Sequence, residues 1–284
     1  MLISGKRNDI VIDKTAGLLN IALCEFAPEW ENVPANLSRL DAVMDEVFNG
    51  SVRNGMPAPD IVVLPECFST GFSMNPGIAE IPGHSRTVGW MQRAAGLYDC
   101  AIAGSVPVWG RDARRYNRLF FVTPGGISGG YSKRHLFFGA ETEAFTPGNS
   151  RTTVEYKGWR IMLGICFDLR FPAWCRNDMN NPYDLYINVA NWPAARKRAA
   201  QSLIEARAIE NAAYVAFCNR AGADALQNYA GGSAVMDFRG RPRFSSMRAS
   251  GTDVIHASLD MAEMLRFRSA FPVLDRMDEF SIKL

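Results

Sequence analysis

The stretch RIMLGICFDLRFP (160–172) places an apolar run directly before a charged, turn-like segment, with Cys166 at the junction. The run RIMLGICFD (160–168) is rich in aliphatic residues and predicts a buried strand. The ends of strands and the loops after them are where α/β folds usually build their sites. Cys166 is therefore either a thiol that fills space or a nucleophile.

Similar apolar runs alternate with helical patterns along the rest of the chain. Strands are predicted over 18–26, 60–66, 100–109, 117–124, 160–168, 184–191, 213–220, 231–238 and 253–260. Helices are predicted over 35–49 and 199–213, where apolar residues recur at the spacing of one helix face. Gly and Pro clusters such as TPGG (123–126) are short enough to be hairpin turns. The alternation predicts one α/β layered domain whose sheets are covered by helices.

Composition and charge exclude several classes of protein. The chain has 284 residues, 48% of them hydrophobic and 21% charged, which fits an ordinary protein with a large core. The net charge is +2, and the basic residues are scattered among acidic ones, so no nucleic-acid or anionic-membrane surface is expected. No apolar run approaches the ~20 residues that cross a bilayer. Residues 1–17 lack the pattern of a signal peptide and are interpreted as an N-terminal extension, with the domain over 18–284. A soluble, cytoplasmic protein is expected.

Cysteine and histidine usage favours a reducing compartment and no metal. The six cysteines are far apart and include no C-x-x-C pair. They are Cys24, Cys67, Cys100, Cys166, Cys175 and Cys218. The three histidines, His84, His135 and His256, are not at ligand spacing, so no zinc site is expected.

Two charged residues follow predicted strands. Glu66 ends DIVVLPE (60–66), where a carboxylate either pairs with a cation or has its pKa raised for proton transfer; the alternative is a surface-loop glutamate. Lys133 follows a Gly-rich turn and leads into HLFF; the alternative for it is a solvated surface charge. Glu143, in a loop that ends at TPG, is ambiguous in the same way.

A nucleophilic cysteine needs a base or a cation nearby and a donor for the oxyanion. At a strand-to-turn elbow, the backbone N–H of Phe167 would supply such a donor. His135 is the alternative partner for the thiol, as in a Cys–His dyad. A third interpretation of Cys166 is a redox-sensing thiol, for which Cys175 would have to lie close enough to form a disulfide with it.

Three motifs in order, LPECFSTGF (64–72), YSKRHLF (131–137) and GICFDLRFP (164–172), resemble those of the nitrilase (carbon–nitrogen hydrolase) superfamily. The resemblance begins near residue 18 and includes NVANWP (188–193) and YAGGSAVMDFRG (229–240). It implies a four-layer α-β-β-α sandwich, subunits that pair as a homodimer or higher homo-oligomer, and no cofactor or metal.

The resemblance also implies roles for single residues. Glu66 would be the general base, Lys133 the cation that stabilises the oxyanion, and Cys166 the nucleophile. Glu143 would match the family's second glutamate, which positions the substrate and the lysine. Phe167 stands where many relatives have tyrosine, which keeps the backbone donor and removes a hydroxyl.

The substrate implied is a small amide. NWP and FPVLDRMDEF (271–280) resemble the ω-amidase branch, which hydrolyses the terminal amide of 2-oxo acids such as 2-oxoglutaramate or 2-oxosuccinamate. Arg170 is a candidate for the substrate carboxylate, with a structural salt bridge as the alternative. Trp192 and Phe72 would wall the pocket, or else pack in the core. An N-carbamoyl-amide hydrolase, a nitrilase and a non-catalytic interaction protein of the same fold remain the alternative functions.

Overall fold

Apolar residues at successive positions of the first strand face two different layers. Leu19 and Ile21 belong to the apolar cluster that includes the second sheet, whereas Ala22 and Cys24 belong to the cluster that includes the first two helices. Side chains of a strand point alternately to its two faces, so a strand that is apolar on both must be covered on both. The architecture follows from this requirement.

The computed structural model describes residues 17–53 and 55–283 and contains two large sheets. The seven-stranded sheet has the order β13-β14-β1-β2-β3-β4-β5, in which β2 is parallel to both neighbours and the other pairs are antiparallel. Its strands are β1 (Leu18–Cys24), β2 (Ile61–Val63), β3 (Ala101–Trp109), β4 (Arg115–Thr123), β5 (Gly126–Ser132), β13 (Ser245–Ala249) and β14 (Thr252–Asp260).

The five-stranded sheet has the order β12-β9-β8-β7-β6, with β7, β8 and β9 parallel. Its strands are β6 (Thr153–Tyr156), β7 (Trp159–Ile165), β8 (Leu185–Ala190), β9 (Tyr214–Asn219) and β12 (Ala234–Met236). A separate hairpin is formed by β10 (Ala221–Ala223) and β11 (Asn228–Ala230).

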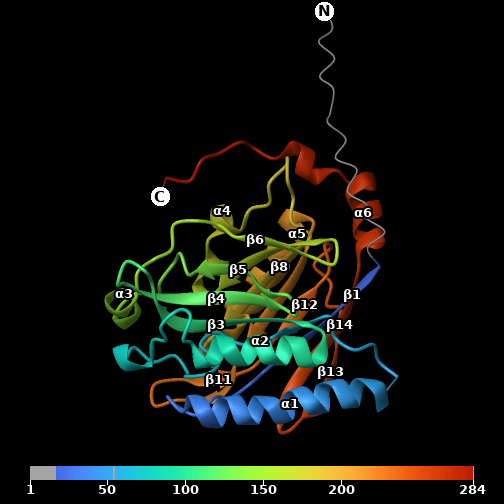
Figure 1. Cartoon of the computed structure of the whole chain (residues 1–284). Coiled ribbons are helices and arrows are strands. Elements are labelled where there is room, and N and C mark those ends of the chain that lie inside the picture. Colours follow the sequence, from blue (N-terminus) through green and yellow to red (C-terminus); the bar gives the residue numbers. More distant parts are fainter. Residues whose placement is uncertain (1–16, 54, 284) are drawn as a thin grey trace, which may run out of the picture.

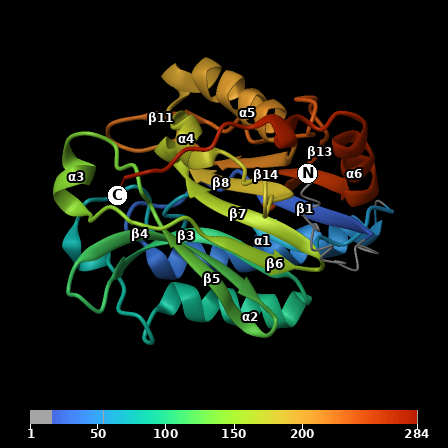
Figure 2. The ribbon, with the colours of Figure 1, turned by 90° about the horizontal axis from the view of Figure 1, so that it is seen from above.

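Helices cover the outer faces of both sheets, which completes the four layers (Figures 1 and 2). The first sheet is covered by α1 (Val33–Arg53) and α2 (Arg86–Tyr98), and the second by α5 (Lys197–Asn211). The remaining helices are α3 (Ala140–Ala144), α4 (Pro172–Cys175), α6 (Met261–Ala270), η1 (Pro76–Ile78), η2 (Cys166–Arg170), η3 (Ala194–Arg196) and η4 (Val273–Arg276). The predicted α-β-β-α sandwich is confirmed.

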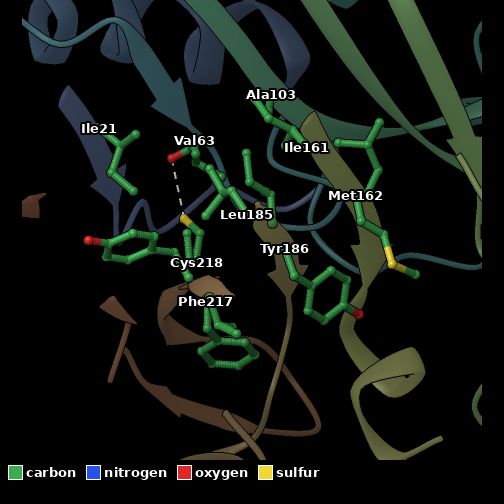
Figure 3. Packing of buried hydrophobic residues seen from close by; sticks show 14 of the residues in the cluster. Ile21, Val63, Ala103, Ile161, Met162, Leu185, Tyr186, Phe217 and Cys218 are labelled. Carbon is green, nitrogen blue, oxygen red and sulfur yellow. Dashed lines mark hydrogen bonds between the residues drawn. The ribbon is translucent and has the colours of Figure 1, made fainter. Parts of the chain in front are cut away.

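The two sheets meet in an apolar layer that also contains a polar contact between them (Figure 3). The Cys218 thiol, on β9 of the second sheet, donates to the carbonyl oxygen of Val63, on β2 of the first, at 3.3 Å. Cys218 is fully buried, and burial raises its pKa well above the usual value. This thiol is structural.

The predicted elements are found, with differences at their ends. The strand predicted over 160–168 ends at Ile165, because Cys166 leaves the extended conformation and begins η2. Only Ala234–Met236 of the run 231–238 is a strand. Among the elements that escaped prediction are helices α2 and α6 and strands β5, β6 and β13; in α2 and β5, glycines interrupt the apolar pattern.

The predicted N-terminal extension, 1–17, lies outside the described residues except for Gly17, and its boundary stays a prediction. No helix over the described ranges combines the length and the apolar character that a membrane crossing requires.

Gly164 supports a stability prediction. A Cβ on this residue of β7 would lie 2.7 Å from Cε2 and 2.8 Å from Cζ of Tyr186, which is fully buried on β8. Gly164→Ala should lower the free energy of unfolding by ~1–3 kcal/mol, because the ring has no room to move. Urea denaturation followed by circular dichroism measures the loss.

Gly96→Ala in α2 is the matched control, since a Cβ there meets no atom within 4 Å. Alanine is favoured over glycine in a helix interior by ~1 kcal/mol, so this variant should be at least as stable as wild type. Equal stability of the two variants would contradict the packing argument.

Candidate active site

Glu66 lies buried at the end of the first sheet's central strand. It follows β2 by three residues and is 1% exposed, so it is not a surface-loop residue. Its Oε1 accepts from the Lys133 ammonium and from Asn117 Nδ2, both at 2.8 Å. Its Oε2 accepts from the backbone N–H of Asn191 at 2.8 Å. Both carboxylate oxygens are thus held in place, by groups from both sheets.

Lys133 directly follows β5 and is also 1% exposed, so it is not a solvated surface charge. Its Nζ donates to Glu66 at 2.8 Å and to the two oxygens of Glu141 at 2.8 and 2.9 Å. Burial alone would lower the pKa of Lys133, but the carboxylates of Glu141 and Glu66 raise it well above its usual value. Lys133 is therefore a fixed ammonium at neutral pH.

The second glutamate of the site is Glu141, so the prediction of Glu143 for this position is wrong. Both residues lie in the short helix α3, but Glu141 is 2% exposed and contacts Lys133, whereas Glu143 is exposed. Residues two apart in a helix point about 200° apart, so only one of them can face the lysine. Glu141 Oε2 also accepts from the backbone N–H of Phe137 at 2.6 Å.

Cys166 occupies an elbow between β7 and η2. Its φ of 44° is in the left-handed region, which non-glycine residues adopt mainly where the surroundings impose it. Burial and the charge of Glu66 raise the pKa of the Cys166 thiol well above its usual value, and Lys133 opposes this only in part. The resting group is therefore a thiol, which needs a base before it can attack.

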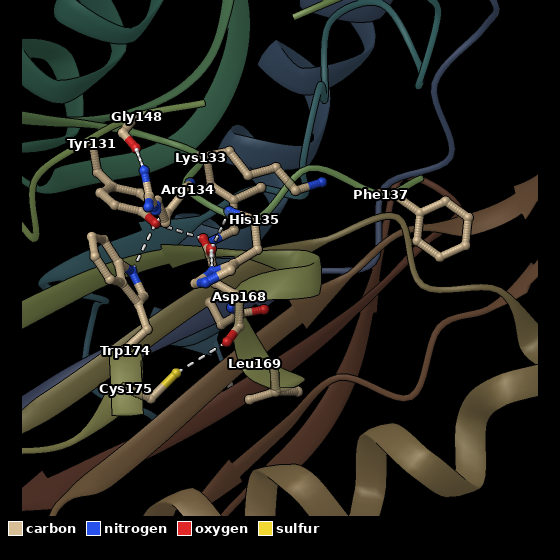
Figure 4. A network of polar contacts seen from close by, with 12 residues as sticks. Tyr131, Lys133, Arg134, His135, Phe137, Gly148, Asp168, Leu169, Trp174 and Cys175 are labelled. Atoms are coloured by element: carbon tan, nitrogen blue, oxygen red, sulfur yellow. Dashed lines mark hydrogen bonds and ion pairs between the residues drawn. The ribbon is translucent and has the colours of Figure 1, made fainter. Parts of the chain in front are cut away.

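A polar network behind the elbow connects the cysteine segment to the lysine segment (Figure 4). The fully buried Asp168 accepts from the Tyr131 hydroxyl at 2.7 Å and from the backbone N–H groups of Ile165 and His135, both at 3.0 Å. These bonds fix the backbone on both sides of Cys166 and just beyond Lys133. Asp168 therefore orients the two reactive segments relative to each other.

The same network accounts for the two alternative partners of Cys166. His135 Nδ1 lies 2.8 Å from Asp168 Oδ1, and its ring stacks on Phe171 with 3.7 Å between centroids, so this histidine is engaged with the aspartate. The Cys175 thiol donates to the carbonyl oxygen of Asp168 at 3.2 Å, and burial raises its pKa to about 12. All six cysteines are free thiols. Among the described residues, neither His135 nor Cys175 forms a hydrogen bond with Cys166, and both are engaged with Asp168 instead.

Cys166, Lys133 and Glu141 open onto one pocket of about 250 Å³. The predicted residues Phe72, Phe167, Arg170 and Trp192 line the same pocket. Arg170 is exposed and lies over the Trp192 ring at 5.0 Å from its centroid, and the described residues give it no acidic partner. The salt-bridge alternative for Arg170 is thus not found.

Sequence reasoning missed three polar residues of the site. Asn117 and Asn191 bind the Glu66 carboxylate, and Arg196 lines the pocket. NVANWP (188–193) contributed to the family resemblance, but it did not mark Asn191 as a contact of Glu66 125 residues away. Across the described ranges, His, Cys, Asp and Glu side chains form no cluster of three that could hold a metal ion.

The arrangement is suited to acyl transfer. It combines a thiol, a carboxylate that can take its proton and a fixed ammonium for a developing oxyanion.

Comparisons with known proteins agree with this chemistry. Residues 20–268 match the family model described as carbon-nitrogen hydrolase. The omega-amidase YafV of Escherichia coli K12 is 39% identical, with 93% of this chain and 98% of that protein covered. The 2-oxoglutaramate amidase of Bacillus subtilis is 32% identical, with coverages of 76% and 84%.

A solved structure is similar over nearly the whole chain. It is a CN-hydrolase superfamily protein of Xanthomonas campestris with an arsenic adduct in its active site. The TM-score is 0.84 at 38% identity, with 94% of this chain and 99% of that chain covered. Together, the family match, the relatives and the shared fold show that the chain is an enzyme that belongs to the carbon-nitrogen hydrolase family of the nitrilase superfamily.

Proposed function

We propose that this enzyme is an amidase of the ω-amidase type, which hydrolyses the terminal amide of a small carboxylated substrate to the acid and ammonia. Substrates such as 2-oxoglutaramate and 2-oxosuccinamate fit this class. The observation that carries the proposal is a buried ammonium between two carboxylates, beside a thiol that opens onto a pocket with cationic side chains. The names of the relatives from Escherichia coli and Bacillus subtilis support the same assignment.

The first half-reaction forms a thioester. Glu66 takes the proton of the Cys166 thiol as the sulfur attacks the amide carbon. The oxyanion is stabilised by the Lys133 ammonium and the backbone N–H of Phe167. The tetrahedral intermediate collapses, the C–N bond breaks, and ammonia leaves with the proton that Glu66 returns.

The second half-reaction hydrolyses the thioester. Glu66 takes a proton from water, whose oxygen attacks the thioester carbon, and the same two donors stabilise the second oxyanion. The C–S bond then breaks, the acid is released, and Cys166 regains its proton. Glu141 holds the ammonium in place through both steps. The two half-reactions as written require no cofactor.

Arg170 is assigned as the residue that binds the substrate carboxylate. Its guanidinium stacks on Trp192 in the pocket. A stacked guanidinium keeps its N–H donors free for a planar acceptor such as a carboxylate. Phe72 and Trp192 supply the apolar walls of the pocket.

The setting proposed is the cytoplasm, which the six free thiols support because secreted proteins usually pair their cysteines. A homodimer or higher homo-oligomer is proposed from the family resemblance.

Ammonia release from a panel of substrates tests the function. The panel contains 2-oxoglutaramate, 2-oxosuccinamate, an N-carbamoyl amino acid and an aliphatic nitrile. Wild type should release ammonia fastest from the two 2-oxo acid amides, and Cys166→Ala should release none, because the variant has no nucleophile. A coupled glutamate dehydrogenase assay measures the ammonia.

Other outcomes of the panel separate the alternatives. Carbon dioxide release from the carbamoyl substrate would favour an N-carbamoyl-amide hydrolase, and turnover of the nitrile would favour a nitrilase. Inactivity of wild type on the whole panel would refute the ω-amidase assignment and favour a non-catalytic protein of this fold.

Two glutamates in one helix give a matched pair of variants. Glu141→Gln removes one negative partner of the buried Lys133, so kcat on the best amide should fall by ~100-fold or more. Glu143→Gln changes the same residue type two positions away on the exposed side, and its kcat should equal that of wild type. Equal losses in both variants, or none in Glu141→Gln, would refute the role given to Glu141.

A further inference from the structure

Arg196 is a cation of the pocket with no acidic partner. It ends η3, lines the pocket with Cys166 and is half-buried. Within the described part of the chain no carboxylate lies within 4.0 Å of it, whereas the buried or half-buried Arg207, Arg239 and Arg268 contact Glu210, Glu263 and Asp184 at 2.8–3.0 Å. Its guanidinium instead lies over the Phe137 ring, 5.2 Å from the centroid.

Phe137 places this guanidinium near the reaction centre. Its ring packs edge-on against Phe167, the residue after the nucleophile, with 5.3 Å between centroids. Its backbone N–H donates to Glu141, which binds Lys133. Arg196 is therefore separated from the nucleophile segment by a single aromatic ring.

The acidic groups of the pocket wall are already engaged. Apart from Glu141, the acidic side chain that lines the pocket is Asp224. Asp224 accepts from the Tyr229 hydroxyl at 2.8 Å and from the backbone N–H groups of Leu226 and Gln227, and its Oδ2 lies 3.5 Å from Arg220. It is the partner of Arg220, so the positive charge of Arg196 is left for a ligand.

Trp192 fixes the positions of Arg196 and Arg170 together. The indole Nε1–H donates to the carbonyl oxygen of Arg196 at 2.9 Å, and Arg170 lies over a face of the same indole. Asn219 anchors the Trp192 backbone, accepting from its N–H at 2.7 Å and donating to its carbonyl at 3.0 Å. One indole thus supports two cations with free donors at the same pocket.

We propose that Arg196 is a specificity-determining residue that binds, together with Arg170, the anionic end of the substrate opposite the scissile amide. The ligand class is an amide with a carboxylate at its far end, in which a 2-oxo oxygen beside the carboxylate offers a further acceptor. A guanidinium has five N–H donors in one plane, which suits such a group of coplanar oxygens. The inference rests on the proposed amidase function and assigns a residue to its substrate selectivity.

The test compares two amides of nearly equal shape. Succinamate has a carboxylate where butyramide has a methyl group, so the ratio of their kcat/KM values measures recognition of the anion. Arg196→Gln should lower kcat/KM for succinamate by ~10- to 100-fold, mainly through KM, and leave the butyramide value unchanged. Arg198→Gln, an exposed neighbour that does not line the pocket, is the control and should keep the wild-type ratio.

A binding measurement keeps the inference testable without turnover. Succinate affinity is measured by calorimetry on Cys166→Ala and on Cys166→Ala with Arg196→Gln, and the second protein should bind ~10-fold more weakly or worse. Unchanged succinate affinity, or a parallel loss for both amides, would overturn the role of Arg196. Inactivity of wild type on every amide would instead refute the proposed function, while the binding comparison would still decide about Arg196.

Discussion

Lys133 carries a positive charge on a side chain that is 1% exposed to solvent, and the site is arranged around that constraint. A buried ammonium is tolerated only if opposite charges and hydrogen bonds compensate for its lost hydration. Glu66 and Glu141 supply that compensation, so the ends of β2 and β5 and the helix α3 must converge on one point. The carboxylates that make the ammonium stable also take part in the reaction proposed at Cys166, so folding and the proposed reaction depend on the same contacts.

The two sheets contribute different residues to the site. The first contributes Glu66, Lys133 and Asn117, and the second contributes Cys166 and Asn191, each at or just beyond a strand end except Asn117, which lies within β4. Hydrogen bonds from Asn191 to Glu66 join the two sets, since its backbone N–H reaches the carboxylate and its Nδ2 reaches the Glu66 carbonyl at 2.8 Å. A shift of one sheet against the other would separate Glu66 from Cys166, the proposed base and the proposed nucleophile.

The layered fold could be predicted from the sequence, and so could the positions of three residues of the proposed site, Glu66, Lys133 and Cys166, because their signals are local. An apolar run that ends in Glu66 or Cys166 is visible in the printed chain, and three ordered motifs indicate the family. The local sequence could not decide whether Glu141 or Glu143 contacts Lys133, because this depends on which side of a one-turn helix faces the lysine. The role of Asn117 could not be predicted for a different reason. It lies within a strand whose sequence pattern is typical of any sheet strand, and only the tertiary fold brings it to Glu66. Arg196 resembles the basic residues around it until the pocket wall is known.

The left-handed backbone at Cys166 restricts which side chains this position can accommodate. With φ at 44°, a side chain branched at Cβ meets the adjacent main chain, so threonine is disfavoured on steric grounds before its reactivity matters. Serine, unbranched and nearly the size of cysteine, is the hydroxyl nucleophile that this elbow can accommodate. Between serine and threonine, the torsion angle of this elbow therefore favours serine as the hydroxyl-bearing replacement for Cys166.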